Sequence, residues 1–586
     1  MAEVNKPLYE PNGAAPRLMS FDDILSHVGD LNRWQLMIFL LFSLVVIATS
    51  FQNMVIVFVG AIPEHWCAVP ELAALPYDVQ KNLSIPYEIS DEGVLKWSAC
   101  EVYSERNYTE TALLYASGGL DSPLPFLFTD GNQTSCENGW VYDQREGAST
   151  FASEWDVVCD KSWLASATGQ SLYMLGFLIG CIVFGEISDR KGRKKTFLLT
   201  VVILGTACTA SAFAPVYPLY IVLRVITGAS VAGFYNSAYC YLIENVGSTY
   251  RNRCSNAYSM YYGVGCMLLA LFAWLVPVWR HLQFGISIWM FILLGYYFLL
   301  DESPRWLYAE GKHKECEMVL RKIAAFNRKS YPENVQMILD EKKHQIVTDD
   351  GKVREPNVMD TLRTPNMRKK SLIMMYQWFV VSMVYYGLSL NSVNLGSNPY
   401  VGFTLASLVE IPAHLVAMYT MKRFGRRLTT SATMLASGIS CLVTALPFLH
   451  GFSWLIVGLA TFGKFSVSIT FTVVYLYSAE IYPTVVRNAG VGSNSVFARV
   501  GAILAPYISM LGTHYSTVTL PLVIFGLPAV IAGVLAMFLP ETKDRVLPET
   551  LNNGEQFGRD QRFWQFMPRK VVDPTISEPM ATPDPV

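Results

Sequence analysis

Four ionisable side chains lie inside long apolar segments of the sequence, where a charge is costly to bury. They are Arg224, Glu410, Lys464 and Arg499. Because charged residues in such surroundings usually contact a partner or a ligand, all four are candidate functional residues. A guanidinium can bind a carboxylate through two parallel hydrogen bonds, so Arg499 predicts a substrate that carries an anionic group. Alternatively, Arg499 pairs with a glutamate of the chain. Lys464 is equally well explained as the partner of Glu410, and Arg224 is better explained by a structural or coupling role.

Aromatic side chains in the same segments could surround an ammonium group, which rings attract by roughly 0.5–2 kcal/mol per contact. Trp378 and Tyr385 are seven residues apart and would share one face of a helix. Lys464, Phe471 and Tyr475 recur at similar helical spacings. Any one ring is also explained by ordinary packing. Together with Arg499 for a carboxylate, however, these rings describe a site for a zwitterion. The aromatic candidates are Tyr173, Tyr235, Trp378, Tyr385, Tyr386, Phe471 and Tyr475.

Twelve apolar segments must position these residues, each close to the roughly 20 residues that a helix needs to cross a membrane. Of the 586 residues, 52% are hydrophobic and only 16% are charged, against about a quarter charged in soluble proteins. The net charge of -2 gives no basic excess for binding nucleic acid. We therefore predict an all-α membrane protein. The expected spans are residues 34–59, 163–184, 196–213, 219–241, 255–276, 284–300, 371–390, 401–420, 429–446, 454–477, 491–510 and 520–539.

Basic residues in the short loops predict the orientation of these helices, since Lys and Arg gather on the cytoplasmic side. Five of them follow the second span and four follow the eighth, whereas the opposite short loops carry only Arg280. Both termini, residues 1–33 and 540–586, and the insert 303–370 are expected in the cytoplasm. Residues 61–162 are expected to form a large extracellular loop between the first span and the block 163–300, with 371–539 holding the later spans.

This expected outer loop contains the chain's three Asn-x-Ser/Thr sites, at Asn82, Asn107 and Asn132. They predict glycosylation, since the loop would face the compartment that holds the glycosylation machinery. The loop also has an even number of cysteines, which predicts two disulfides in an oxidising compartment, with three possible pairings. The cysteines are Cys67, Cys100, Cys136 and Cys159.

The two halves of the chain repeat each other at a nearly constant offset. Gly192 matches Gly425, Glu244 matches Glu480, and Glu302 matches Glu541. Ion pairs at helix ends can hold the two halves of a transporter together and release them when substrate binds. Alternatively, the basic residues only fix topology and contact lipid headgroups. The second copy has Lys422 where the first has Asp189, so its clamp must be different or weaker. The candidate clamp residues are Asp189, Arg190, Arg193, Glu244, Arg251, Glu302, Arg305, Arg426, Glu480 and Arg487.

Several motifs along the chain make it similar to a known family. They include Phe21-Asp22-Asp23, Pro63-Glu64-His65-Trp66-Cys67, Glu302-Ser303-Pro304-Arg305 and Glu480-Ile481-Tyr482-Pro483. The chain resembles the organic cation, carnitine and organic anion transporters of the major facilitator superfamily, that is, solute carrier family 22. The resemblance implies two pseudo-symmetric six-helix bundles, plasma-membrane residence and alternating access without covalent chemistry. It departs from the family in having four loop cysteines where many relatives have six, and Asp301 where a proline is common.

Residues 474–480 and 387–391 look most like the carnitine-type branch of that family. Cation carriers of the family tend to have Asp in this part of the eleventh helix, whereas anion and carnitine carriers tend to have Arg, as at Arg499. We therefore expect a small organic cation or zwitterion as substrate, such as carnitine, a betaine or an amino-acid-derived amine. An organic anion transporter and a transport-inactive receptor are the alternatives. No enzyme motif or metal-ligand spacing is evident, no cofactor is expected, and co-transport of sodium or protons stays open.

Overall fold

The computed structural model describes most of the 586 residues. The described ranges are 21–89, 95–104, 108–116, 132–143, 149–331, 359–394, 398–446, 452–514, 519–545 and 547–561.

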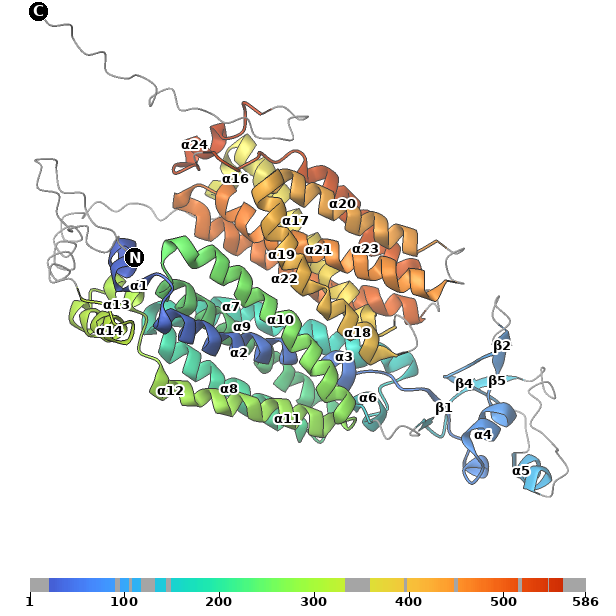
Figure 1. The fold of residues 1–586 in the computed structure, drawn as a ribbon. Coiled ribbons are helices and arrows are strands. Elements are labelled where there is room, and N and C mark those ends of the chain that lie inside the picture. Colours follow the sequence, from blue (N-terminus) through green and yellow to red (C-terminus); the bar gives the residue numbers. More distant parts are fainter. Residues whose placement is uncertain are drawn as a thin grey trace, which may run out of the picture.

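The first half of the chain forms one helical bundle (Figure 1). Long apolar runs keep their main-chain hydrogen bonds inside each helix, as a segment in lipid must. The membrane-length helices of this half are α2 (Arg33–Met54), which continues as α3 (Ile56–Val59), α7 (Gly169–Lys191), α8 (Arg193–Ala212), α9 (Tyr217–Asn245), α10 (Ser248–Leu275) and α11 (Trp279–Ile292), which continues towards α12 (Tyr296–Leu299).

The second half forms a similar bundle that lies beside the first. One of its spans is broken: α18 (Pro399–Leu408) and α19 (Glu410–Phe424) are separated at Val409. Pro412 explains the break because it has no N–H for the carbonyl of Leu408. The other helices of this half are α17 (Pro365–Asn391), α20 (Arg426–Thr444), α21 (Ser453–Ile481), α22 (Arg487–His514) and α23 (Thr519–Ala536).

All twelve expected spans coincide with helices, although not all have the same character. Ten helices of the described chain are long and apolar enough to cross a membrane. The other two expected spans are α20, which is rich in Ser and Thr, and α23, which is shorter. Several helices begin earlier than expected, since α10 starts at Ser248 and α17 at Pro365. Their polar first turns extend the helix beyond the apolar segment.

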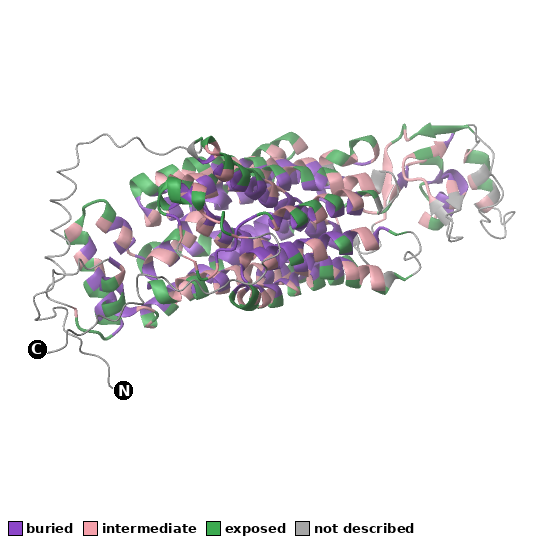
Figure 2. Cartoon of the chain, turned by 90° about the horizontal axis from the view of Figure 1, so that it is seen from above, coloured by how far each residue is buried: buried purple, intermediate pink, exposed green. Residues whose placement is uncertain are grey.

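Glycines let neighbouring helices within each bundle approach closely. A Cβ atom added at Gly176 of α7 would lie 2.1 Å from the carbonyl oxygen of Val225 on α9. The same addition at Gly501 of α22 would lie 2.2 Å from the carbonyl oxygen of Phe379 on α17. Such close backbone contact is how membrane helices associate without a hydrophobic driving force. The buried residues accordingly fill the interior of both bundles (Figure 2).

The segment between α3 and α7 contains short strands, which no sequence pattern had suggested. They form three antiparallel pairs: β1 (His65–Cys67) with β6 (Trp140–Tyr142), β2 (Tyr87–Ile89) with β3 (Leu95–Trp97), and β4 (Glu101–Tyr103) with β5 (Gln133–Ser135). Short helices accompany them, namely α4 (Tyr77–Ser84), α5 (Tyr108–Ala116) and α6 (Phe151–Glu154). Disulfides join Cys67 to Cys136 and Cys100 to Cys159, which selects one of the three possible pairings.

The opposite end of the molecule carries short helices from three parts of the chain. They are α1 (Phe21–Gly29), α13 (Pro304–Ala309), α14 (His313–Phe326), α16 (Asp360–Arg363) and α24 (Leu551–Gln556). We call this the charged end, because the predicted clamp residues lie there, and the end with the strands the loop end. Which end faces the cytoplasm stays a prediction from the basic loops.

Candidate functional site

An ion-pair network ties together the charged end of the first half. The Arg193 guanidinium lies 2.9 Å from the Asp189 carboxylate and 3.0 Å from that of Glu244. The Glu302 carboxylate accepts hydrogen bonds from the N–H groups of Arg193 and Lys194, at 2.8 and 2.9 Å. These N–H groups belong to the first turn of α8 and have no hydrogen-bond partner within the helix. The Glu302 carboxylate supplies that partner, and its negative charge interacts favourably with the helix dipole.

The second half repeats this arrangement. Arg426 pairs with Glu480 at 2.7 Å, and Glu541 accepts from the N–H groups of Arg426 and Arg427 at 2.9 and 3.0 Å. The matched pairs found in the sequence therefore occupy equivalent places in the two bundles. Lys422 cannot replace Asp189, so the arginine of the second network has one carboxylate partner fewer.

The remaining clamp candidates have separate roles. Arg251 and Arg305 both bind the carboxylate of Asp22 on α1, at 3.0 and 3.2 Å, which fixes that helix to the charged end. Arg190 pairs with Glu186 one turn away, and both side chains are exposed. Arg487 donates to the Thr484 hydroxyl at 3.2 Å. Asp22 was part of the family motif but was missed as a site residue, because its partners lie more than two hundred residues away.

The two halves contact each other near the loop end. Phe58 of α3 packs on Tyr400 and Phe403 of α18, with ring centroids 5.6 and 5.1 Å apart. The Ser171 hydroxyl donates to the carbonyl of Ile503 at 2.6 Å. In the part of the chain that the structure describes, no ion pair joins one half to the other; the clamp residues pair within their own half. The contacts between halves thus close the loop end.

Arg499 lies between the two halves. Its guanidinium carbon is 4.0 Å from the ring centroid of Phe177, which belongs to α7 of the first half. The hydroxyls of Tyr386 and Tyr475 interact with the same guanidinium. Arg499 is half-buried, and among the described residues no carboxylate lies within ion-pair distance of it. The internal Arg–Glu pair considered from the sequence is therefore not formed here.

Glu410 and Lys464 form a buried ion pair of their own. The ammonium nitrogen lies 3.0 Å from the carboxylate, and the side chains are 3% and 6% exposed, Lys464 and Glu410 respectively. The Tyr385 hydroxyl donates to Glu410 at 2.7 Å, and the Lys464 nitrogen lies 3.2 Å from the centre of the Tyr385 ring. Glu410 is the first residue of α19, beside the helix break. Lys464 is thus the partner of Glu410 in this structure.

Most of the predicted aromatic residues form a continuous cluster in the second half. Trp378 contacts Tyr475 at 4.3 Å, Tyr475 contacts Phe471 at 5.7 Å, and Phe471 contacts Tyr385 at 5.2 Å between ring centroids. Tyr475 is 45% exposed although its hydroxyl interacts with Arg499 and with Cys181 and Tyr239 of the first half. The exposed Tyr475 ring therefore lies within electrostatic range of groups from both halves.

Both predicted rings of the first half interact electrostatically with Arg499. Tyr235 of α9 interacts with both Tyr475 and Arg499. Tyr173 is fully buried and also packs against Arg224, whose guanidinium carbon is 4.6 Å from its ring centroid. Arg224 also donates to the carbonyl of Gln52 at 3.2 Å. These contacts favour a structural role for Arg224.

Comparisons with known proteins agree with this architecture. The profile of the family described as "Sugar (and other) transporter" matches residues 127–552. The chain is 37% identical over 546 residues to the "Organic cation transporter protein" of Drosophila melanogaster, covering 92% of this chain and 95% of that protein. It is 32% identical over 553 residues to human "Solute carrier family 22 member 2", covering 92% and 96%. The chain belongs to solute carrier family 22 of the major facilitator superfamily. It is therefore a membrane transporter and not an enzyme.

Solved structures show the same fold as this family 22 member. The proton:xylose symporter XylE, bound to 6-bromo-6-deoxy-D-glucose, aligns with a TM-score of 0.53 at 16% identity, covering 89% of this chain and 98% of that one. An inward open form of XylE from E. coli aligns with a TM-score of 0.51 at 18% identity, covering 67% and 90%.

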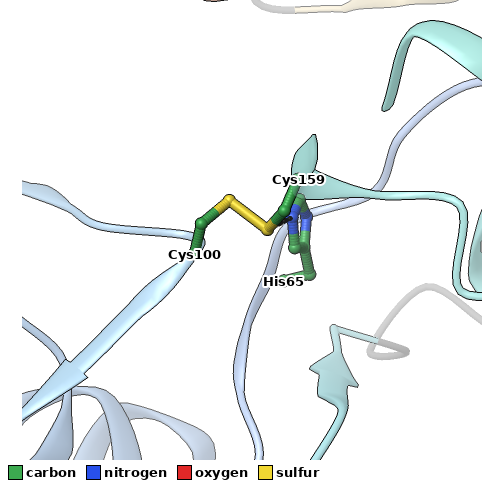
Figure 3. Close-up of side chains that lie close together, drawn as sticks. All are labelled: His65, Cys100 and Cys159. Carbon is green, nitrogen blue, oxygen red and sulfur yellow. Dashed lines mark hydrogen bonds between the residues drawn. A yellow bond between two sulfur atoms is a disulfide. The ribbon is translucent and has the colours of Figure 1, made fainter. Parts of the chain in front are cut away.

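One group in the strand segment of this transporter resembles a metal site. Ligand atoms of His65, Cys100 and Cys159 all lie within 4.8 Å of one another. The two cysteines are joined as a disulfide, however, as Figure 3 shows. A metal needs the thiolate, so the disulfide removes both sulfurs as ligands. Burial lowers the pKa of the neighbouring His65.

The predicted glycosylation sites lie in the same segment. Asn82 is on α4 and Asn132 is exposed just before β5, whereas Asn107 lies outside the described residues.

Proposed function

We propose that this protein is a plasma-membrane secondary transporter of a small organic cation or zwitterion, such as a carnitine-like, betaine-like or amino-acid-derived amine. The observation that carries the proposal is the position of Arg499, which faces Phe177 across the two halves and has Tyr235 and Tyr475 beside it. The Drosophila melanogaster relative is named as an organic cation transporter, which supports an amine as part of the substrate.

The charges of the site support a carboxylate as the other part. Glu410 and Lys464 neutralise each other, whereas Arg499, beside the aromatic cluster, has no carboxylate within ion-pair distance among the described residues. A substrate carboxylate would supply that partner. The exposed ring of Tyr475 and the adjoining Trp378 would then contact the ammonium group. An organic anion would use Arg499 alone and would gain nothing from the rings as cation-binding groups.

The contacts between the two halves support alternating access as the mechanism. They are closed at the loop end by Phe58 and Ser171, while the clamp residues of the charged end pair within each half. We infer that substrate leaves or enters through the charged end in this state. The clamp residues would exchange partners across the halves in the opposite state. The basic loops support a cytoplasmic position for the charged end.

The driving force depends on the net charge of the substrate. A cation would enter down the membrane potential, which supplies about 2.3 kcal/mol per charge per 100 mV. A zwitterion has no net charge, so its accumulation would need exchange or a co-transported sodium ion or proton.

Uptake by reconstituted vesicles tests the proposal. The panel consists of tetraethylammonium as a cation, carnitine as a zwitterion and benzoate as an anion, each measured with and without sodium. We expect saturable uptake of carnitine or tetraethylammonium and little uptake of benzoate. Uptake of benzoate alone would support the anion alternative, and absence of flux with retained binding would indicate a receptor.

A further inference from the structure

The first turn of α17 is capped by a side chain from the far end of the chain. Thr364 stands at the N-cap position of α17 but makes no capping hydrogen bond of its own. Instead, the N–H groups of Asn366 and Met367 donate to the Glu555 carboxylate, at 3.1 and 2.9 Å. Free N–H groups and the helix dipole both favour an anion at this position. Glu555 therefore takes the place of a local cap.

The segment that carries Glu555 is held to α17 by further contacts. Lys370 is buried and donates to the carbonyls of Gly554 and Phe557, at 2.8 and 2.6 Å. A side chain of α24 thus accepts hydrogen bonds from main-chain N–H groups of α17, and a side chain of α17 donates to main-chain carbonyls of the α24 segment. We call residues 554–557 the tail latch. A Cβ at Gly554 would lie 2.4 Å from Pro483, so the latch also rests against the corner between α21 and α22.

Glu555 remains ionised in this position. Burial alone would raise its pKa, but hydrogen bonds from the Thr364 hydroxyl and from the Met367 and Asn366 N–H groups outweigh burial and lower the pKa to about 2. The charge of the cap is therefore constant at any pH that a cell experiences.

The first half has a similar closure with a neutral residue. The N–H of Trp34, at the start of α2, donates to the Asn327 side chain at 2.9 Å. The amide of Asn327 donates in turn to the Val28 carbonyl and to Gln35, both at 3.1 Å. Asn327 follows α14, which comes after the last membrane-length helix of the first half, just as Glu555 on α24 comes after that of the second half. In both halves the first long helix is therefore capped from beyond the last one, which makes an incidental contact a poor explanation.

The latch acts on the helix that carries much of the proposed site. Trp378 and Tyr385 lie on α17, which is unbroken from Pro365 to Asn391. Trp378 is only about 16 Å along the helix from Met367. Its indole N–H donates to Ser478 at 2.7 Å, and its ring packs on Tyr475. A change in the position of the first turn would therefore move these rings relative to α21.

We propose that Glu555 is a positioning residue for transport: its ionised carboxylate holds α17 in the place where Trp378 and Tyr385 can meet the substrate. The proposal rests on the proposed transport function, because it concerns how well the substrate is bound. It requires that weakening the latch alters substrate affinity without any contact between Glu555 and substrate.

The test compares Glu555→Gln with Glu549→Gln, a nearby exposed glutamate outside the latch. KM is measured for whichever of tetraethylammonium and carnitine is transported. We expect KM to rise roughly two- to fivefold in Glu555→Gln, the effect of losing a negative charge at a helix N-terminus, and to stay unchanged in Glu549→Gln. Because KM does not depend on the amount of protein, it can still be measured for a variant that is poorly expressed.

Hydrogen exchange of residues 365–371 provides a readout that needs no substrate. Exchange should speed up in Glu555→Gln and not in Glu549→Gln. Gly554→Ala should give the same two changes by steric separation, and the double variant Gly554→Ala/Glu555→Gln should be no worse than either single variant. Faster exchange with unchanged KM would overturn the positioning role, and unchanged exchange would overturn the latch. If neither probe is transported, the transport proposal fails, while exchange still decides whether the latch exists.

Discussion

The ammonium nitrogen of Lys464 lies 3.0 Å from the carboxylate of Glu410, and both side chains are almost fully buried. The pair sits next to the break between α18 and α19, with the Tyr385 hydroxyl as a third member. Each charge depends on the other, because an unpaired charge in this position would be poorly solvated.

Removing only one member of this pair should therefore be more harmful than removing both. Lys464→Met leaves the Glu410 carboxylate buried alone, which we expect to cost about 3–5 kcal/mol of stability. The double variant Lys464→Met/Glu410→Gln should regain much of that loss. The loss of stability in each single variant and in the double variant is measured as the change in melting temperature of the purified protein in detergent. A double variant whose loss equals the sum of the single losses would contradict the coupling.

Gly192 should tolerate no side chain. Its φ is +102°, and an added Cβ would lie 2.3 Å from the Glu302 carboxylate that caps α8. We expect Gly192→Ala to cost about 1–3 kcal/mol, through backbone strain and displacement of the cap. Gly185→Ala is the matched control, since nothing lies within 4 Å of a Cβ there. Equal melting temperatures for the two variants would contradict this prediction, because they would show that the Glu302 carboxylate can move aside without loss of stability.

Labelling of Cys240 tests the proposed orientation of the transporter. Of the free cysteines in the described chain, it is the exposed one, and it lies on α9 close to Glu244 and Arg193. A membrane-impermeant maleimide should label it in inside-out vesicles and leave it unlabelled in right-side-out vesicles. Cys240→Ser should abolish that labelling. Labelling from outside would reverse the assigned orientation.

The disulfide pairing can be read directly by mass spectrometry of unreduced peptides. We expect linked peptides that join Cys67 to Cys136 and Cys100 to Cys159. Loss of either bond by Cys→Ala substitution should cost about 2–5 kcal/mol within the segment. A peptide joining Cys67 to Cys100 would show that another pairing forms.

The sequence predicted features that depend on local pattern. Apolar spans identify the helices, and the offset between Glu302 and Glu541 identifies equivalent caps in two bundles. Boundaries were less accurate, because the polar first turns of α10 and α17 carry no hydrophobic signal. The pairing of Lys464 with Glu410 was foreseen only as an alternative.

Contacts between distant parts of the chain could not be predicted in this way. Nothing in the sequence indicates that Phe177 faces Arg499, that Asp22 binds Arg251, or that Glu555 caps α17. Each depends on how separate helices pack. Likewise, nothing in the sequence indicates that the Tyr173 ring packs beneath the Arg224 guanidinium.

The central claim is that Arg499 binds an anionic group of the substrate, and charge reversal tests it most directly. Carnitine and tetraethylammonium uptake are compared in the wild type, Arg499→Lys and Arg499→Asp, each normalised to the protein present at the surface. A lost charge-assisted hydrogen bond of about 1.5–3 kcal/mol corresponds to a loss of roughly 10- to 150-fold. We predict that loss for carnitine in Arg499→Asp, a smaller one in Arg499→Lys, and retained tetraethylammonium uptake in both. Unchanged carnitine uptake in Arg499→Asp would contradict the account.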